Sequence, residues 1–234
     1  MKKDLVTKLV PLFQGLSPSE VDEAVVEVKK QVDAEVLEKR RNELEKLFDS
    51  QMETLKLRDC PSAILEAFQD KRDEVLSTTI EMEIPKGNIP FIPVIPSSYV
   101  GIYTLMSMVR NKEKVGYTYL DPNEIINNEE TPKNPYFIYD VEPGKETLGK
   151  SVEKAQEFIK KQNRLCHIPD EDIAVCIHTD TLSDHHLWST GSRVRQDGRV
   201  PFVYLDRGEP RLNWTSIDDS DVSRWGFASC CERG

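Results

Sequence analysis

Residues 141–158, "VEPGKETLGKSVEKAQEF", contain a stretch with the spacing of a phosphate-binding P-loop. Gly144 is followed by four residues and then by Gly149, Lys150 and Ser151. In a P-loop, backbone N–H groups and a helix N-terminus surround phosphate groups, and the lysine neutralises their charge. The spacing therefore raises the hypothesis of a nucleotide-dependent enzyme.

The surroundings of this stretch favour a simple turn before a helix. A P-loop domain needs several βαβ units of about 30 residues or more each, whereas much of residues 152–234 has the pattern of β-hairpins. Glu142 and Glu146 would also place negative charge beside a bound phosphate. We therefore expect a turn and a helix N-terminus here, and keep nucleotide binding as the alternative.

A second group of chemically active residues lies at 166–186, "CHIPDEDIAVCIHTDTLSDHH", which holds all four histidines and two of the five cysteines. Zinc sites commonly show Cys-x-x-Cys pairs, or two histidines at i, i+4 with a glutamate between them. Neither spacing occurs here. We expect no metal and no other cofactor, and a metal-dependent hydrolase using this cluster remains an alternative.

The third candidate is a set of arginines near the carboxyl end. After Lys161 every Lys or Arg position is arginine, and all three tryptophans lie in the same stretch. Arginine has a planar, bidentate fork and stacks on aromatic rings, so this mixture suits recognition of a carboxylate or phosphate. We hypothesise that Arg193, Arg211 and Arg224 converge with Trp225 around an anionic group. Internal pairing of these arginines with aspartates is the alternative.

These residues must be positioned by the elements around them, and the chain begins with a helical pattern. Ser17 and Glu20 form a capping box, and neither proline nor glycine interrupts residues 19–60. A single helix of this length would be about 60 Å long, so we favour a break near Asp33. The alternative is an unbroken helix that forms a coiled-coil homodimer through a valine stripe, namely Val21, Val25, Val28 and Val32.

Beyond this helix the sequence predicts an α+β fold, with a helical region over residues 1–78 and a mixed, mainly antiparallel domain over residues 79–234. Because prolines recur every third residue in "IPFIPVIP", this segment is a rigid connector or an edge strand. The other predicted elements are helices at 61–76, 151–162 and 169–179, strands at 80–84 and 134–141, a hairpin around "NKEK" and a hairpin around "DRGE".

Several long segments of the chain resemble a known family. The segments "IPFIPVIPSSYVGIYTLMSMVR", "KVGYTYLDP", "PYFIYDVEPGKETLGKS", "GSR" and "SRWGFASC" are similar to the landmarks of a group of bacterial proteins of unknown function. The resemblance covers roughly residues 60–234. It implies a bacterial, cytosolic protein, and it carries no activity or catalytic residues over to this chain.

Composition narrows the function further. The net charge is −10 and the pI about 5.0, which argues against a general nucleic-acid binder because such proteins need a basic face. Asp4 and Lys8 interrupt the apolar run of a signal peptide, and no window is apolar enough to span a bilayer.

From these patterns together we expect a cytoplasmic binding protein rather than an enzyme. Its expected partner is a small anion or a protein segment, and neither nucleic acid nor membrane.

Overall fold

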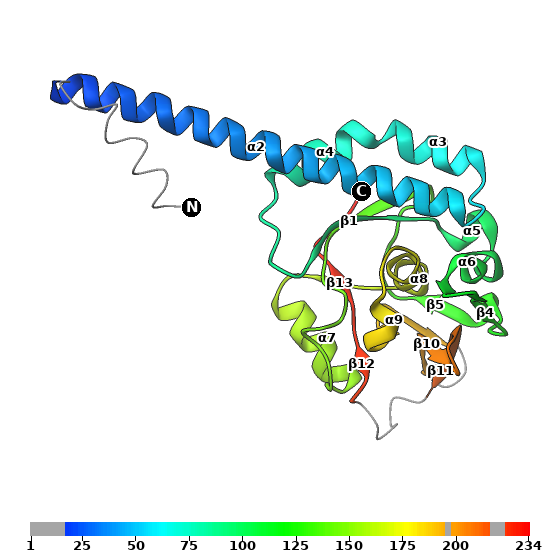
Figure 1. Cartoon of the computed structure of the whole chain (residues 1–234). Helices are drawn as coiled ribbons and strands as arrows, with labels where there is room; N and C mark the ends of the chain where they lie inside the picture. Colours follow the sequence, from blue (N-terminus) through cyan, green and yellow to red (C-terminus); the bar gives the residue numbers. More distant parts are fainter. Residues whose placement is uncertain (1–16, 195–197, 216–222) are drawn as a thin grey trace. The chain divides into compact units, whose positions relative to one another are not determined.

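The computed structural model describes residues 17–194, 198–215 and 223–234 (Figure 1). The predicted α+β class is confirmed, with helices and mainly antiparallel sheets. The chain divides into two compact units, Met1–Glu45 and Lys46–Gly234. The boundary that the sequence placed after residue 78 lies inside the second unit. There, Phe48 and Phe68, from the first helices of the unit, pack against the ring of Phe137 at 5.9 and 5.2 Å.

Helix α2 (Pro18–Leu57) is continuous over 40 residues, so the predicted break near Asp33 is wrong. One of the two bonds of the expected capping box is present in its first turn, since the backbone N–H of Ser17 donates to the carboxylate of Glu20. The Ser17 hydroxyl donates to the same carboxylate. Without an internal proline or glycine, nothing in the sequence interrupts the i to i−4 hydrogen bonds. The remaining helices are α3 (Ser62–Asp70), α4 (Arg72–Glu81), α5 (Ser97–Val100), α6 (Ile102–Met108), η2 (Pro122–Glu124), α7 (Val152–Lys161), α8 (Pro169–His178) and α9 (Thr181–Asp184).

The strand predicted at residues 80–84 is wrong, because α4 continues to Glu81. The alternation there is only three apolar residues long. Val75 and Thr79, one helical turn apart, are both fully buried, and the Thr79 hydroxyl donates to the Val75 carbonyl. Burial of this helical face therefore outweighs the short period-two pattern.

The first sheet has the order β1-β6-β14, and its strands are β1 (Ile89–Val94), β6 (Tyr136–Val141) and β14 (Glu232–Arg233). Strand β1 carries the regularly spaced prolines and lies at the edge of the sheet, as one reading of the sequence expected. Both neighbours of β6 are antiparallel to it. The central strand is buried along its whole length.

The second sheet has the order β12-β8-β10-β11-β4. Its strands are β12 (Trp225–Gly226), β8 (His186–Trp188), β10 (Val200–Asp206), β11 (Glu209–Thr215) and β4 (Tyr117–Thr118). The predicted hairpin around "DRGE" is confirmed as β10 and β11. Three short pairs complete the sheets: β13 (Ser229–Cys230) with β7 (Leu165–Cys166), β2 (Arg110–Asn111) with β3 (Lys114–Val115), and β5 (Ile125–Asn127) with β9 (Ser192–Val194).

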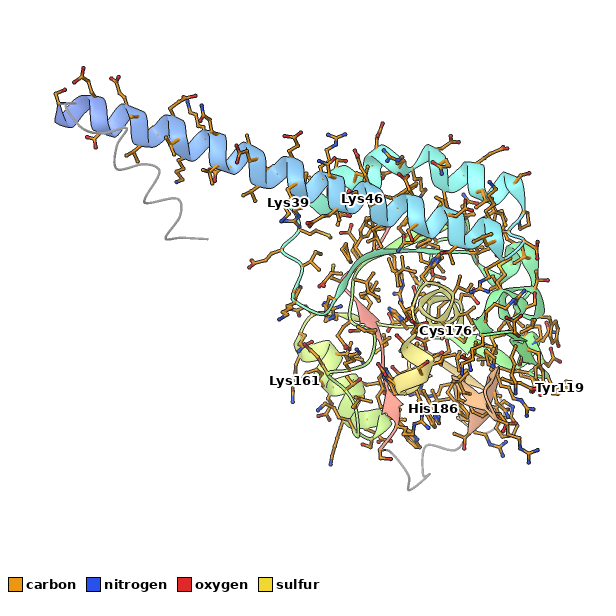
Figure 2. The ribbon with its side chains drawn as sticks, viewed as in Figure 1. Lys39, Lys46, Tyr119, Lys161, Cys176 and His186 are labelled. Carbon is orange, nitrogen blue, oxygen red and sulfur yellow. The ribbon has the colours of Figure 1, made fainter. Side chains whose placement is uncertain are left out.

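Helix α8 lies at the centre of the second unit (Figure 1). Nine consecutive residues, Pro169–Ile177, are buried, and Figure 2 shows Cys176 deep in the interior while Tyr119 lies at the edge of the unit. Because α8 is buried on all sides, its polar residues must find partners inside the protein. In the parts of the chain that the structure describes, no helix combines the length and apolarity needed to cross a membrane.

Candidate functional site

The P-loop-like stretch binds a carboxylate of its own chain. The side chain of Glu142 accepts hydrogen bonds from the backbone N–H groups of Gly144, Lys145 and Glu146, at 3.0, 2.6 and 3.1 Å. Glu142 is only 4% exposed, and burial raises the pKa of this carboxyl while the three N–H groups oppose the shift. The donors that would surround a phosphate in a P-loop are therefore already used within the turn.

Packing fixes the same turn from the other side. Thr147 Oγ1 lies within hydrogen-bond distance of the Gly144 and Phe227 carbonyls and accepts from the Phe227 N–H. Gly144 has φ +93°, and a Cβ added there would lie 3.0 Å from both Gly226 and His185 Nε2. The preceding strand belongs to an antiparallel sheet. The four P-loop-like residues thus form a turn before α7, and Lys150 Nζ lies 4.8 Å from the centre of the Phe158 ring.

The histidine and cysteine cluster contains a buried polar group that resembles a catalytic triad in its residue types. Asp172 lies between its partners, with Oδ1 3.1 Å from His167 Nδ1 and Oδ2 accepting from Ser189 Oγ at 2.6 Å. In a catalytic triad the histidine, and not the carboxylate, contacts the nucleophile. All three residues are 0% exposed, so this group joins β7, α8 and β8 inside the core.

The other histidines do not gather around a common centre. His185 Nε2 contacts the Pro143 carbonyl at 2.9 Å, and burial lowers its pKa. His186 lies on the second sheet, 5.8 Å from the Tyr204 ring, and His178 ends α8. Among the described residues, no group of three or more His, Cys, Asp or Glu side chains is placed to hold a metal ion.

The four residues that the arginine hypothesis grouped together are separated in the structure. Arg211 is in β11 and Trp225 in β12, with β8 and β10 between them, which corresponds to about 14 Å at the usual strand spacing. Arg193 is in β9 and donates to the carbonyls of Thr190 and Ser192. Arg224 is exposed just before β12, whereas Trp225 is 3% exposed. The structure therefore does not bring these arginines to one centre.

Arg211 nevertheless lies in an aromatic row that crosses the second sheet. The register places Arg211 opposite Tyr204 on one side and Tyr117 on the other. The Tyr204 ring stacks on Phe202 at 4.7 Å, and the Arg211 guanidinium lies 4.8 Å from the centre of the Tyr117 ring. We call the half-exposed residues of this row, completed by the neighbouring Tyr119, the aromatic face: His186, Phe202, Tyr204, Arg211, Tyr117 and Tyr119.

The row begins in the core and ends at the surface. Phe202 stacks on Trp188 at 4.8 Å, and Trp188 stacks on Trp225 at 3.8 Å beneath helix α7. At the other end, Tyr119 is 89% exposed. The opposite side of the sheet carries buried residues such as Leu187 and Val203. The sheet is thus anchored on one side and at one end, and the aromatic face is its open part.

The charges on the aromatic face are already paired. Arg211 Nη1 lies 2.5 Å from Asp206 Oδ2, and Nη2 lies 3.4 Å from Glu209 Oε2. Lys114 Nζ lies 3.8 Å from the other oxygen of Glu209. A pocket of about 50 Å³ opens beside Arg211 and Tyr117. Ligand pockets usually measure about 300–1,000 Å³, so the aromatic face is a surface for contact and not a deep site.

Sequence reasoning missed most of the aromatic face. The usable signal was the spacing of two residues between Tyr117 and Tyr119 and between Phe202 and Tyr204, because alternate residues of a strand share one side of the sheet.

Sequence reasoning also missed the buried ion pair of Glu171 and Arg233. Arg233 Nε donates to Glu171 Oε1 at 2.6 Å and its Nη2 donates to Oε2 at 2.9 Å, although 62 residues separate them.

The comparison with known families agrees with the resemblance found in the sequence. A family of unknown function, DUF5701, matches residues 51–234, and the chain belongs to this family. Nothing among curated proteins or solved structures matches the chain. The matched range begins inside α2 and covers the aromatic face, the Glu142 turn and the buried α8.

Proposed function

We propose that this member of DUF5701 is a binding protein whose aromatic face recognises a protein segment with basic and aromatic side chains. The observation that carries the proposal is the row of side chains that leaves the core at Trp188 and reaches the surface at Tyr119. Within this row Arg211 stands between the rings of Tyr204 and Tyr117. Exposed aromatic rings supply much of the contact energy of protein interfaces. Rings held by stacking also lose little conformational freedom on binding.

The shape of the face supports a protein segment as the ligand. A pocket of about 50 Å³ cannot enclose a typical small ligand. The face extends from β8 to β4, across four neighbouring strands, or about 14 Å. An extended peptide advances about 3.3 Å per residue, so some four residues would cover it.

The charges support a basic rather than an acidic partner. An anion approaching Arg211 would have to displace Asp206, which lies 2.5 Å from the guanidinium. By contrast, a cation can lie over the exposed ring of Tyr119 or the half-exposed ring of Tyr204 without breaking an ion pair, because ring faces carry partial negative charge. The net charge of −10 also attracts basic segments at long range.

Two synthetic octapeptides test this function. One alternates arginine with tryptophan, the other glutamate with tryptophan, and binding of each is measured by fluorescence anisotropy. We expect the arginine peptide to bind and Tyr119→Ala to weaken it about three- to fivefold, the equivalent of one exposed cation–π contact. Tyr103→Ala is the matched control, since Tyr103 is 53% exposed but lies on α6. Tighter binding of the glutamate peptide, or an equal loss in the control, would contradict the proposal.

We also propose that the protein acts in the bacterial cytoplasm. All five cysteines are free thiols, and four of them are buried, which suits a reducing compartment. Fractionation of cells that express the full chain would test the location, and recovery in the membrane or exported fraction would contradict it.

The two enzyme alternatives raised by the sequence have less support than a binding protein. The turn N–H groups that a nucleotide phosphate would need bind Glu142 instead, and the histidines that a metal would need are dispersed.

A further inference from the structure

The second unit contains three basic side chains that lie at the ends of three helices. Arg58 directly follows α2, Arg110 begins β2 just after α6, and His178 is the last residue of α8. Arg110 donates to the carbonyl of Val109. In the part of the chain that the structure describes, these three side chains form no other hydrogen bond and no ion pair. We call Arg58, Arg110 and His178 the basic cluster.

The packing of the three helices brings this cluster together (Figure 1). Leu55 of α2 and Ile177 of α8 line one small, mainly apolar cavity together with a residue of α6. Burial lowers the pKa of His178, and the nearby charge of Arg58 lowers it further. Burial and the charge of Arg110 act in the same direction on the pKa of Arg58. The members of the cluster are therefore within range of one another's charge.

Holding these groups together without an anion is unfavourable. All three side chains are half-buried, and both ring nitrogens of His178 are buried without a partner among the described residues. Like charges that lie close together repel, and a buried polar atom without a hydrogen bond costs free energy. Other half-buried or buried arginines of this protein each pair with a carboxylate, namely Arg164, Arg211 and Arg233. An anion between the two guanidiniums of the cluster would remove both costs.

The acidic residues nearest along the chain do not supply this anion. Asp59 and Asp180 are exposed, and neither forms an ion pair within the described ranges. Asp170 lies eight residues before His178 on α8, or about 12 Å along the helix axis, and its carboxylate accepts from the Ser97 N–H. The net charge of the chain is −10, so acidic side chains are abundant but are not placed here. The anion that fits the cluster therefore comes from outside the chain.

We propose that Arg58, Arg110 and His178 bind a phosphate group. A phosphate monoester carries about −1.5 to −2 charges at pH 7, which matches two guanidiniums, whereas a carboxylate carries only one charge. Arginine bonds phosphate oxygens through its planar fork, and a neutral imidazole adds one N–H donor. None of the three residues belongs to the aromatic face, so this site is separate from the proposed peptide surface.

Calorimetric titration of the full chain in phosphate-free buffer tests the site. We expect inorganic phosphate to bind in the millimolar range or tighter, and acetate at the same ionic strength to bind at least tenfold more weakly because it carries one charge and two oxygens. O-phosphoserine, a phosphate monoester, identifies the source of the group. Tighter binding of O-phosphoserine than of inorganic phosphate would assign the site to a phosphorylated ligand, and weaker binding would assign it to the free ion.

Substitutions locate the binding to the cluster. Arg58→Gln and Arg110→Gln should each weaken phosphate binding about tenfold or more, because each removes charge-assisted hydrogen bonds. His178→Leu removes one neutral donor and should weaken it by about fivefold. Arg224→Gln, at an exposed arginine, is the matched control and should bind like the wild type. An equal loss in this control would show that phosphate responds only to overall charge, which would contradict the proposal.

Thermal unfolding distinguishes a binding site from a purely structural role. Without phosphate, Arg58→Gln should be at least as stable as the wild type, because the repulsion from Arg110 is relieved. Phosphate should then raise the melting temperature of the wild type and not that of the variant. If these cations only offset the dipoles of the helix ends, Arg58→Gln would be less stable without any anion and phosphate would stabilise neither protein. That result, or the absence of binding by both phosphate probes, would overturn the proposal.

Discussion

Single buried residues control much of the pH response expected of this protein. Both ring nitrogens of His178 are buried and lack a hydrogen-bond partner among the described residues, and burial lowers its pKa to about 3. Burial raises the pKa of Asp170 to about 6, although the Ser97 N–H opposes the shift. As pH falls below 6.5, His178 therefore destabilises the folded state, whereas Asp170 stabilises it as pH falls through 6.

Replacement of His178 by leucine should separate these two effects. In the unfolded chain a histidine binds a proton below about pH 6.5, whereas the buried His178 of the folded state does not. Below this pH the unfolding free energy of the wild type should therefore fall by about 1.4 kcal/mol per pH unit relative to that of His178→Leu. Near pH 7 the variant should be at least as stable as the wild type, because it removes two unpaired buried nitrogens. Urea unfolding from pH 7 to pH 5 measures the difference, and parallel curves for the two proteins would refute this explanation.

Arg233 is the second residue whose removal should have a large effect. It neutralises Glu171, which is 0% exposed. Burial acts to raise the pKa of Glu171, but its bonds to Arg233 and the charge of His167 outweigh this and lower the pKa. Arg233→Met leaves the buried Glu171 carboxylate without its partner and should cost about 3–5 kcal/mol of unfolding free energy.

The pH dependence of the stability of Arg233→Met distinguishes the cost of an unpaired buried carboxylate from a simple loss of packing. In the wild type the stability from the lowered pKa of Glu171 is lost as pH falls. In the variant the Glu171 carboxyl has lost its hydrogen-bonded cation, so acid should reduce the difference in stability between the two proteins. Adding Glu171→Gln should recover part of the loss, while Arg224→Met, at an exposed arginine, should change stability little. A loss that is independent of pH in Arg233→Met would show that packing alone is responsible.

At the scale of elements, the turn that joins β6 to α7 is the clearest case in which sequence spacing misleads. Three N–H groups that resemble phosphate donors bind Glu142. Glu142→Gln weakens these charge-assisted hydrogen bonds and should cost about 1.5–3 kcal/mol. Lys150→Ala should leave stability nearly unchanged, because among the described residues it removes only the contact between the Lys150 ammonium and the Phe158 ring.

Nucleotide titration completes the test of this turn. We expect no heat of binding when magnesium ATP or GTP is added to the wild type, because the turn has no free N–H cradle and its strand lies in an antiparallel sheet. Calorimetry provides the measurement. Micromolar binding that disappears in Lys150→Ala would restore the nucleotide-dependent enzyme as an interpretation.

Elements whose patterns are local were predictable from the sequence, and those that depend on distant partners were not. The helices beginning at Val152 and Pro169, the edge strand at "IPFIPV" and the hairpin of β10 and β11 follow from caps, prolines and turn residues. The strand expected at 80–84 failed because burial of the α4 face decided that segment. The aromatic face combines β8, β10, β11 and β4, whose order in the sheet is fixed only by tertiary packing.

At the scale of the whole molecule, the chain provides two surfaces of different kinds. The first unit exposes apolar side chains along α2, Val25 and Val36 among them, and the second carries the aromatic face on its five-stranded sheet.

Hydrogen exchange along α2 tests how stability is distributed through the molecule. Residues 20–43 have no buried side chain among those described, whereas Phe48, Met52 and Leu55 of the same helix are buried. Helices without tertiary contacts are only marginally stable, so amides of the first part should exchange much faster than those after Lys46 in a dilute sample. Exchange mass spectrometry measures both parts of the helix, and uniform protection along α2 in a dilute sample would contradict this distribution.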